Sequence, residues 1–286
     1  MDVSIIIVSW KVKELLRENL KALFRSTGDL SFEVFVVDNH SADGTLEMVA
    51  KEFPQVNLIA NNYNAGFAAA NNQAMEMAQG DFILLLNPDM RVFPDTLLKM
   101  HAFMKKNKEV GVASCRLVDE EGGNIDHVRK FPTFLNQLAV VLKIPHIFPG
   151  VLNNYLMKGF DYDREAEVDS VRGAFFMISR EVIDAIGKLD PIYFIWFEEV
   201  DYCMRVKSAG RKVVYTPEAK CIDYVGKSFS QVARGETQKY FRDSMLKYFK
   251  RWHSFWSWFF LYLAWPLGIL LANLADMIKI KKRIKT

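Results

Sequence analysis

The 286-residue sequence predicts an α/β fold, with a mixed, mainly parallel sheet flanked by helices. Short apolar runs of strand type alternate with segments of helical periodicity along the first 115 residues. The runs are apolar at most positions and do not alternate with polar residues, as expected for parallel strands covered by helices on both faces. Strands are predicted at 3–8, 33–37, 56–60, 82–86 and 111–115, and helices at 12–24, 44–52, 64–79 and 94–106.

The second half of the chain is less regular. Residues 131–156 are apolar and interrupted by three prolines, which predicts an irregular segment, either a mobile flap or a segment on the acceptor side. A strand at 170–178 and helices at 180–186 and 197–209 follow. A further strand at 212–215 is predicted to end at Pro217, because proline interrupts strand pairing.

Composition excludes several classes of protein. Half of the residues are hydrophobic and a quarter are charged, so the chain is neither disordered nor fibrous. The three cysteines lack a CxxC spacing, which excludes a disulfide scaffold and a zinc knuckle and indicates a reducing compartment. The first residues lack the basic start of a signal peptide, so we expect the active part of the protein to stay in the cytosol.

The C-terminal region predicts contact with a membrane surface. Residues 276–286 hold five Lys or Arg and one Asp (+4), so the other 275 residues sum to −1 of the total of +3. This basic tail follows the apolar stretch 255–275, which favours an anionic lipid surface over a nucleic acid. Because Pro266 and Gly268 interrupt the stretch and both flanks are basic, we expect a kinked hairpin or two interfacial helices. A single span and a buried core helix are the alternatives.

Acidic side chains follow two of the predicted strands. Asp38 follows the second strand and Asp89 the fourth, at the edge where parallel sheets bind ligands. The sequence has neither a GxGxxG nor a P-loop motif, so we expect phosphates to be held through Mg²⁺ or Mn²⁺. Asp89 is the first candidate ligand, with Asn87 as a neutral contact. The alternative is that residues 87–89 form only a turn.

Two other segments are candidates for binding a nucleotide. The carboxylate of Asp38, at the tip of a buried strand, can accept hydrogen bonds from a base or ribose. Asn64, Gly66 and Asn71 place small or amide residues at a helix start, where an anion or ribose can approach. A simple helix cap explains this second segment equally well.

The strongest signal is an acidic cluster inside an aromatic segment. Glu198, Glu199 and Asp201 lie among aromatic residues, where burial and mutual repulsion raise carboxyl pKa values. One of them is therefore a candidate general base. The alternative is an acid-rich first turn of a helix, and Arg205 is predicted to pair with Asp201 four residues away.

Taken together, these segments resemble the family-2 glycosyltransferases of GT-A fold, in particular their rhamnosyltransferase-like branch. The resemblance covers about residues 1–230 and rests on five motifs in the same order. They are VVDNHSADGT, NYNAGFAAANN, LLLNPD, VRGAFFMISREVIDAIGKLDPIYFIWFEEVDYCMRVKSAG and YTPEAKCIDYVGKSFS.

The resemblance implies an inverting transfer of a sugar from a nucleotide donor to a hydroxyl. By position, Asp38 would contact the donor base or ribose, with Asn64, Gly66 and Asn71 nearby. Residues 87–89 take the place of the family's Asp-x-Asp motif, so Asp89 would bind the cation between the donor phosphates.

The second half of the resemblance concerns the reacting sugar. Arg172 and Gly173 would lie near the donor sugar, and Glu199 takes the place of the base, beside Glu198. Two departures stand out. The family pair is usually Glu-Asp, and a family His that can join the metal is replaced by Asp223. Three interpretations of Asp223 stay open: it supplies an oxygen ligand, it leaves the cation to Asp89 alone, or the departure alters activity.

These observations predict a metal-dependent glycosyltransferase at the cytoplasmic face of the membrane. Residues 1–230 form the transferase domain (1–115 binding the nucleotide sugar, 116–230 the acceptor and catalytic half), and 231–286 the membrane-associated segment. The resemblance favours dTDP-rhamnose as donor, and the apolar C-terminal stretch favours a lipid-linked saccharide as acceptor. Galactofuranose, glucose or N-acetylhexosamine donors, and an inactive scaffold of a polysaccharide assembly complex, are the alternatives.

Overall fold

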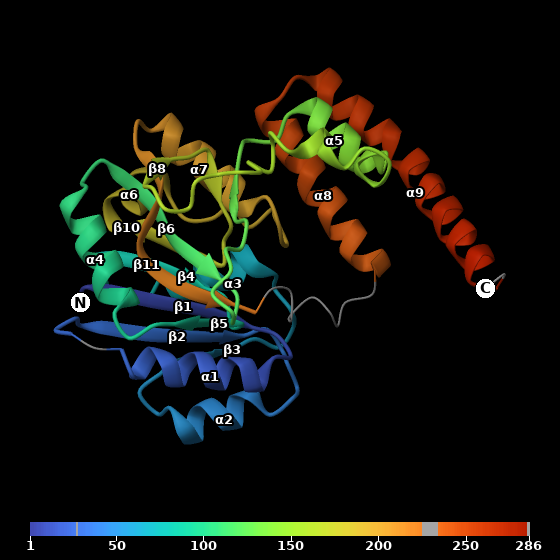
Figure 1. Ribbon diagram of the computed structural model, residues 1–286. Helices are drawn as coiled ribbons and strands as arrows, with labels where there is room; N and C mark the ends of the chain where they lie inside the picture. The colour runs from blue at the N-terminus through green and yellow to red at the C-terminus, as the bar shows by residue number, and fades with distance from the viewer. Residues whose placement is uncertain (27, 225–233, 285–286) are drawn as a thin grey trace.

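A mixed sheet forms the centre of the molecule (Figure 1). The computed structural model describes residues 1–26, 28–224 and 234–284. Nine strands of this part form one sheet in the order β3-β2-β1-β4-β10-β6-β11-β5, with β8 beside β11. The first four in this order run parallel, and β10 is antiparallel to both neighbours. The strands are β1 (Val3–Ser9), β2 (Phe32–Asp38), β3 (Asn57–Ala60), β4 (Phe82–Leu86), β5 (Met90–Val92), β6 (Val110–Val118), β8 (Ala166–Glu167), β10 (Phe175–Ser179) and β11 (Lys212–Asp223).

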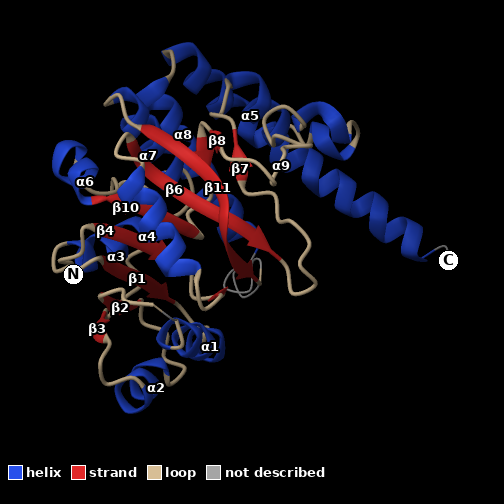
Figure 2. Cartoon of the chain, turned by 60° about the vertical axis from the view of Figure 1, so that its left-hand side comes forward, coloured by secondary structure: helices blue, strands red, loops and turns tan. Residues whose placement is uncertain are grey.

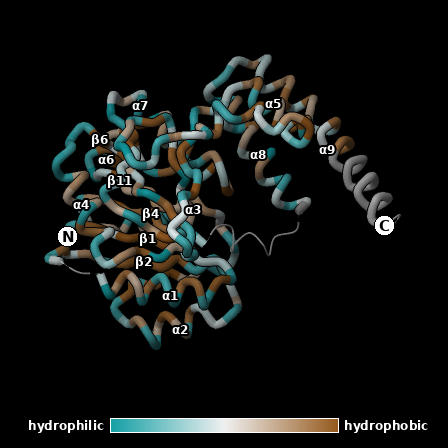
Figure 3. Tube along the Cα trace, viewed as in Figure 1, coloured by the Kyte–Doolittle hydropathy of each residue, from teal (hydrophilic) through white to brown (hydrophobic). Residues whose placement is uncertain are grey.

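Helices cover both faces of this sheet, as the apolar strands predict. Ile5 of β1 packs with α1, α2 and α4 on one face, and Ile6 packs with α3, α6 and α7 on the other. Figure 3 shows β1, β2 and β4 as hydrophobic ribbons between these layers. The helices are α1 (Lys13–Phe24), α2 (Thr45–Glu52), α3 (Phe67–Met75), α4 (Thr96–Lys106), α6 (Arg180–Ile186) and α7 (Glu198–Ser208).

Strand direction gathers the polar segments at one edge of the sheet. The parallel strands β1, β2 and β4 all end there. Because β10 is antiparallel to β4, its first residue, Phe175, lies opposite Leu86, the last residue of β4. The backbone N–H of Asn87 donates to the carbonyl oxygen of Ala174 at 2.9 Å. Segments before β10 and after β4 are thus joined.

Two strands differ from their predicted bounds. The predicted strand 170–178 is divided into β9 (Ser170–Val171) and β10, and β9 pairs with β7 (Val128–Arg129) in a small second sheet. The prediction that Pro217 ends a strand is wrong. The pairing of β11 with β6 shifts register between Thr216 and Lys220, and this bulge accommodates the proline, which has no N–H to donate. β11 therefore continues to Asp223 at the same edge of the sheet (Figure 2).

Part of the segment 131–156, predicted to be irregular, is helical. It contains α5 (Phe134–Val141) and two short 3₁₀ helices, η1 (Ile144–His146) and η2 (Pro149–Leu152). A capping box starts α5: Thr133 accepts from the backbone of Asn136, whose side chain accepts from Thr133. This reciprocal pair satisfies two N–H groups that a helix start otherwise leaves free.

The C-terminal region consists of α8 (Arg234–Trp252) and α9 (Phe255–Ile284). The prediction that 255–275 forms a kinked hairpin or two interfacial helices is wrong, because α9 is one helix that continues through Pro266. Gly268 allows close packing instead: a Cβ there would collide with the carbonyl oxygen of Val141 in α5. Within the described residues, no helix combines the length and apolarity needed to cross a membrane. The division of the chain at residue 230 stays a prediction.

Candidate functional site

Asp38 lies buried at the end of β2, with 1% of its surface exposed. Its Oδ2 accepts a hydrogen bond from the backbone N–H of Ser41 at 3.0 Å. Its Oδ1 has no hydrogen-bond partner in the described part of the chain. Asp38 also lines a cavity of about 540 Å³ between α1 and α2, beside the cationic side chains of Lys13 and Lys51. Charged side chains of both signs line this cavity, so an Asp38 oxygen with spare acceptor capacity suits a polar ligand that donates hydrogen bonds.

The segment before α3 is shaped by local hydrogen bonds. Asn64 Oδ1 accepts from the backbone N–H of Gly66 at 3.0 Å, and Asn71 Nδ2 donates to the carbonyl oxygen of Phe67 at 2.9 Å. These bonds give both amides a role in building the helix start. Asn39 adds a longer link, because its Nδ2 donates to the carbonyl oxygen of Gly66 at 3.1 Å. The segment is thereby fixed beside the end of β2.

Gly66 connects this segment to the turn before α7. Its φ of 82° lies in the left-handed region that favours glycine, and a Cβ would collide with the carbonyl oxygen of Phe194. The same oxygen accepts a hydrogen bond from the N–H of Phe67 at 2.7 Å. The start of α3 and the aromatic turn are therefore in direct backbone contact.

The aromatic turn itself has an unusual backbone. Trp196 and Phe197 have φ values of 62° and 68°, a conformation that costs about 1–3 kcal/mol for each non-glycine residue. Helix α8 supports it: Ser244 Oγ donates to the carbonyl oxygen of Ile195 at 2.8 Å, and the rings of Phe197 and Tyr248 lie 5.5 Å apart. Backbone strain of this kind concentrates at functional sites.

Two adjacent carboxyl groups, Glu198 and Glu199, follow the turn. Glu198 is buried, with 4% exposed, and Glu199 is half-buried. Burial raises the pKa of both carboxyls, and the charge of Glu199 raises that of Glu198 further. The Oε2 atom of each is buried and lacks a hydrogen-bond partner among the described residues. A glutamate with a raised pKa is suited to take up a proton.

Arg172 lies between Glu199 and the end of β11. Its guanidinium is 3.1 Å from Asp223 Oδ2, and its charge lowers the pKa of Glu199 against the effect of burial. Gly173, the next residue along the chain, packs beside Glu199: a Cβ there would lie 3.7 Å from the Cβ of Glu199. The predicted donor-sugar residues, the predicted base and Asp223 therefore belong to one cluster.

Asp89 and Asp223 lie on neighbouring chain segments. Asp89 is buried, and its carbonyl oxygen accepts from the N–H of Tyr224 at 3.1 Å, while Asp223 pairs with Met90. Asn87 contributes through its backbone, because its carbonyl oxygen accepts from Asn19 Nδ2 at 2.9 Å. Over the described residues, no group of three or more His, Cys, Asp or Glu side chains is arranged to hold a metal ion. The rest of the fifth motif, residues 225–230, lies outside the described residues.

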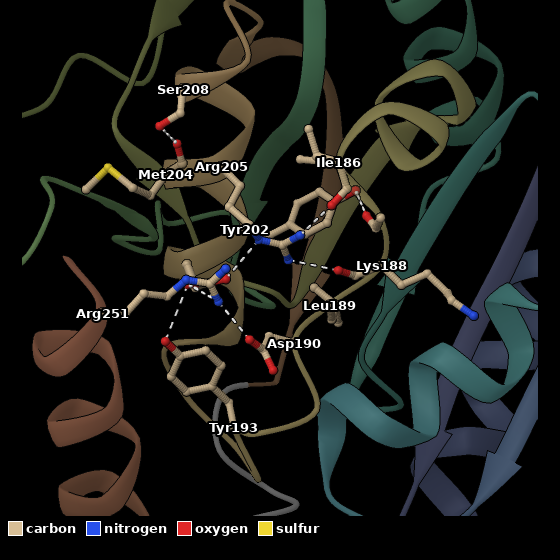
Figure 4. Close-up of polar contacts among 12 residues, drawn as sticks. Ile186, Lys188, Leu189, Asp190, Tyr193, Tyr202, Met204, Arg205, Ser208 and Arg251 are labelled. Atoms are coloured by element: carbon tan, nitrogen blue, oxygen red, sulfur yellow. Dashed lines mark hydrogen bonds and ion pairs between the residues drawn. The ribbon is translucent and has the colours of Figure 1, made fainter.

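Asp201 belongs to a different network. Its side chain is fully buried; Oδ2 accepts from Arg205 Nε at 3.0 Å, and Oδ1 from Trp252 Nε1 at 2.7 Å. Arg251 lies 3.3 Å from Oδ1 and 2.7 Å from Asp190 (Figure 4). The predicted pairing with Arg205 is confirmed. Because both oxygens are engaged between α7 and α8, the geometry gives Asp201 a structural role.

Arg129 and Tyr155 are two residues of the site that the sequence did not indicate. The charge of Arg129 lowers the pKa of Glu199 against the effect of burial. Burial raises the pKa of Tyr155, and the charge of Glu199 raises it further. Arg129 is fixed by hydrogen bonds to the carbonyl oxygens of Val128 (2.8 Å) and Asp126 (3.1 Å). Both residues lie in or next to the segment predicted to be irregular, where no periodicity indicates a neighbour.

Comparison with known proteins identifies the family. Residues 4–187 match the family described as Glycosyl transferase family 2. The chain belongs to this family. It is 26% identical over 230 residues to the rhamnosyltransferase WbbL of Escherichia coli, covering 78% of this chain and 83% of that protein. It is 24% identical over 207 residues to the N-acetylglucosaminyl-diphospho-decaprenol L-rhamnosyltransferase of Mycobacterium tuberculosis, covering 67% and 66%.

A solved structure agrees with the GT-A type of fold. The mannosyltransferase from Pyrobaculum calidifontis in complex with GDP-mannose and Mn²⁺ superposes with a TM-score of 0.60 and 18% identity, covering 96% of this chain and 75% of that one. This likeness concerns the fold. The chain spans 28% and 62% of the lengths of two further curated relatives that it matches.

Proposed function

We propose that this protein is an inverting glycosyltransferase that moves a sugar from a nucleotide-sugar donor to a hydroxyl during cell-surface polysaccharide synthesis. The observation that carries the proposal is the position of Glu199. It has a raised pKa, lies against Gly173 and faces Arg172, at the sheet edge where Asp38 and Asp89 also lie. Family membership supports the same reaction class.

Glu199 is the proposed general base. Its carboxylate takes the proton of the acceptor hydroxyl as that oxygen bonds to the anomeric carbon, and the bond from this carbon to the donor phosphate breaks on the opposite side. The departing nucleoside diphosphate takes the bonding electrons. Arg172, 3.1 Å from Asp223, brings positive charge to this side of the site.

We propose dTDP-rhamnose as the donor. Two relatives carry rhamnosyltransferase names, which supports a deoxyhexose. Asp38 Oδ1 and the adjacent cavity of about 540 Å³, which polar and charged side chains of both signs line, suit a base or ribose. A galactofuranosyl, glucosyl or N-acetylhexosaminyl donor would use the same reaction chemistry and is the alternative.

We propose Mg²⁺ or Mn²⁺ as the cofactor. Asp89 and Asp223 lie on chain segments paired at the β5–β11 end. Mg²⁺ commonly takes one or two protein carboxylates together with phosphate oxygens. The two carboxylates therefore fit a cation whose remaining ligands include oxygens of the donor diphosphate. When bound, the cation stabilises negative charge on the leaving diphosphate. The Mn²⁺ complex of the mannosyltransferase supports this assignment.

A membrane surface is the proposed location, at its cytoplasmic face. Helix α9 has two apolar stripes: one, with Leu261, Trp265 and Gly268, is buried against α5 and α8. The opposite stripe is exposed and consists of Trp256, Phe260, Leu263, Leu267 and Leu270. An apolar stripe open to solvent, with basic residues before and after it in the sequence, is typical of a helix that lies in the lipid interface.

Vesicle sedimentation tests this location. The triple substitution Trp256→Ser, Phe260→Ser and Leu263→Ser removes exposed contacts and leaves the buried stripe of α9 in place. We expect the parent protein to pellet with phosphatidylglycerol vesicles and the triple variant to stay in the supernatant. The control, Met77→Ser, removes an apolar side chain with a similar exposed fraction (56%) from the half that is predicted to bind the nucleotide sugar, and this variant should pellet. Equal sedimentation of parent and triple variant would refute the lipid interface.

A lipid-linked saccharide is the proposed acceptor, because an interfacial helix beside the site brings the base close to such a substrate. The printed name of the mycobacterial relative, which includes diphospho-decaprenol, supports this class. A catalytically inactive scaffold is the second candidate, favoured by the two departures from the family motifs at Glu199 and Asp223.

Nucleotide binding separates the enzyme from the scaffold. We expect dTDP and Mn²⁺ together to raise the melting temperature, because a ligand that binds only the folded state stabilises it. We also expect slow hydrolysis of one nucleotide sugar from a panel of dTDP-, UDP- and GDP-linked donors. Stabilisation that needs both nucleotide and metal supports the proposed enzyme. Failure of every nucleotide to stabilise the protein would favour the scaffold.

A further inference from the structure

A second cavity lies between the exposed helix α9 and the turn that precedes the proposed base. Its volume is about 300 Å³, and it is lined by Val140 and Val141 of α5, Phe241 of α8, Trp265 of α9 and Trp196. Figure 1 shows α5, α8 and α9 side by side at this end of the molecule. Four of these five side chains, all except Val140, belong to or pack against one hydrophobic cluster, and Lys143, Thr237 and Gln238 complete the lining.

The cavity has a fixed relation to the site. Trp196 lines it and lies two residues before Glu198 in the strained turn. On the opposite wall, Trp265 belongs to the buried stripe of α9, one helix width from the exposed stripe. Gly268 holds α9 against Val141, which is also a wall residue. The cavity therefore lies between the proposed lipid interface and the acceptor side of the base.

Positive charge accompanies these apolar walls. Lys143 lines the cavity at the end of α5, with a left-handed φ of 59°. The guanidinium of Arg242 lies 5.8 Å from the ring of Trp265, and its Nε is buried without a hydrogen-bond partner in the described residues. An apolar cavity with adjacent cations is complementary to a hydrocarbon chain that carries phosphate at one end.

We propose that this cavity binds the first isoprenoid units of a lipid-linked acceptor, with the acceptor's phosphate beside Lys143. The inference rests on the proposed function and adds to it a site for the lipid. The chain would enter from the exposed stripe of α9, and its saccharide would extend past Trp196 toward Glu199. Such a site would select acceptors by their lipid, independently of the sugar.

Binding of geranylgeranyl diphosphate tests the proposal. The measurement is made with dTDP and Mn²⁺ at saturation, so that the donor site does not compete for the diphosphate. We expect the parent protein to bind geranylgeranyl diphosphate, with Trp196 and Trp265 reporting through fluorescence. Inorganic diphosphate lacks the hydrocarbon chain and so loses the apolar contacts, and farnesol lacks the charge and so loses the attraction to Lys143. Each should bind at least about tenfold more weakly than geranylgeranyl diphosphate.

Filling the cavity provides the decisive variants. Val140→Trp should weaken binding of the probe by about tenfold or more, since it removes the apolar volume. Gln238→Trp fills the same cavity from α8 and provides a second variant in case the first fails to fold. The matched control is Leu135→Trp on the same helix, where the side chain is 74% exposed and outside the cavity. Lys143→Asn, which tolerates the left-handed backbone, should weaken the diphosphate and leave farnesol unchanged.

The outcomes separate this inference from the function on which it rests. Loss of probe binding in the two filled variants, with retention in Leu135→Trp, supports the lipid site. Equal affinity in folded filled variants and parent overturns it. If dTDP and Mn²⁺ stabilise the parent but geranylgeranyl diphosphate does not bind, the lipid site alone is refuted. If the nucleotide has no effect either, the proposed function fails as well.

Discussion

The backbone N–H of Phe67, the first residue of α3, donates a hydrogen bond to the carbonyl oxygen of Phe194 at 2.7 Å. This bond joins the first half of the chain to the turn that positions Glu198 and Glu199. Gly66 is what permits so close an approach, because any Cβ at this position would meet the same oxygen. The donor-side and base-side halves of the proposed site are thus in direct backbone contact at this point.

Gly66→Ala should therefore reduce transfer activity and stability together. Its φ of 82° strains an alanine, and the new methyl group also displaces Phe194. Gly187→Ala is the matched control: its φ is 79°, and an added Cβ there meets no atom of the described chain within 4 Å. We expect urea unfolding to show a larger loss for Gly66→Ala, by about 1–3 kcal/mol. Equal losses would mean that the contact contributes nothing beyond backbone strain.

The pH dependence of transfer should reflect the charge of Arg172. Burial raises the pKa of Glu199, and Arg172 lowers it. A base works only when deprotonated, so activity should rise with pH through the pKa of Glu199. Arg172→Gln removes the charge and should move this acidic limb to higher pH, in addition to any loss of rate. The measurement is the pH profile of kcat/KM. If its acidic limb lies at the same pH in Arg172→Gln as in the parent, the limb reports the ionisation of a group other than Glu199.

Glu198 should make folding less favourable as the pH rises. Burial and the charge of Glu199 raise its pKa in the folded state above that in the unfolded chain. The folded protein therefore binds this proton more tightly, and stability is lost as the pH rises from the unfolded to the folded pKa. Glu198→Gln removes this loss, so its melting temperature relative to the parent should be higher at about pH 8 than at about pH 4.

The matched control for Glu198→Gln is Glu121→Gln on an exposed loop. Its melting temperature should follow that of the parent at both pH values. A Glu198→Gln difference that is constant with pH would show that the carboxyl does not titrate differently in the two states.

Trp252 should stabilise the protein through its hydrogen bond to Asp201. Trp252→Phe keeps an aromatic ring at this position and removes the donor at 2.7 Å from a fully buried carboxylate. A hydrogen bond to a charged group contributes about 1.5–3 kcal/mol, and the variant should lose a comparable free energy of unfolding. Trp256→Phe, at a ring that is 63% exposed, should change it by less than about 0.5 kcal/mol. Equal free energies for the two variants would contradict the structural role of Asp201.

Local patterns in the sequence were enough to predict most of the parallel half of the fold. The apolar runs that became β1, β2 and β4 are largely buried, so their composition carries the signal, while β3 is an edge strand with no buried residue. Thr133 and Asn136 show where a local signal was present and missed, since their reciprocal cap marks the start of α5. Pro217 led to a wrong strand end, because the bulge between Thr216 and Lys220 places the proline where no N–H is needed for pairing with β6.

The sequence predicted those residues of the candidate site whose chemical type and sequence neighbours both indicate a function. Glu198 and Glu199 stand among aromatic residues in the sequence, and burial does raise their pKa values. The pair of Arg172 and Asp223 depends on the reversed direction of β10 and on the length of β11. Strand pairing between such distant residues leaves no local pattern. The contact of Trp252 with Asp201 joins two helices far apart in the sequence, so it could not be predicted from a local pattern either.

The rate of Glu199→Gln tests the central claim most directly. Glutamine keeps the shape of the side chain and cannot take up the acceptor's proton, so turnover should fall by about 100-fold or more. Stabilisation by dTDP and Mn²⁺ should remain as in the parent, because the substitution leaves Asp38 and Asp89 in place. Transfer at the parental rate by a variant that still binds the nucleotide would contradict the account.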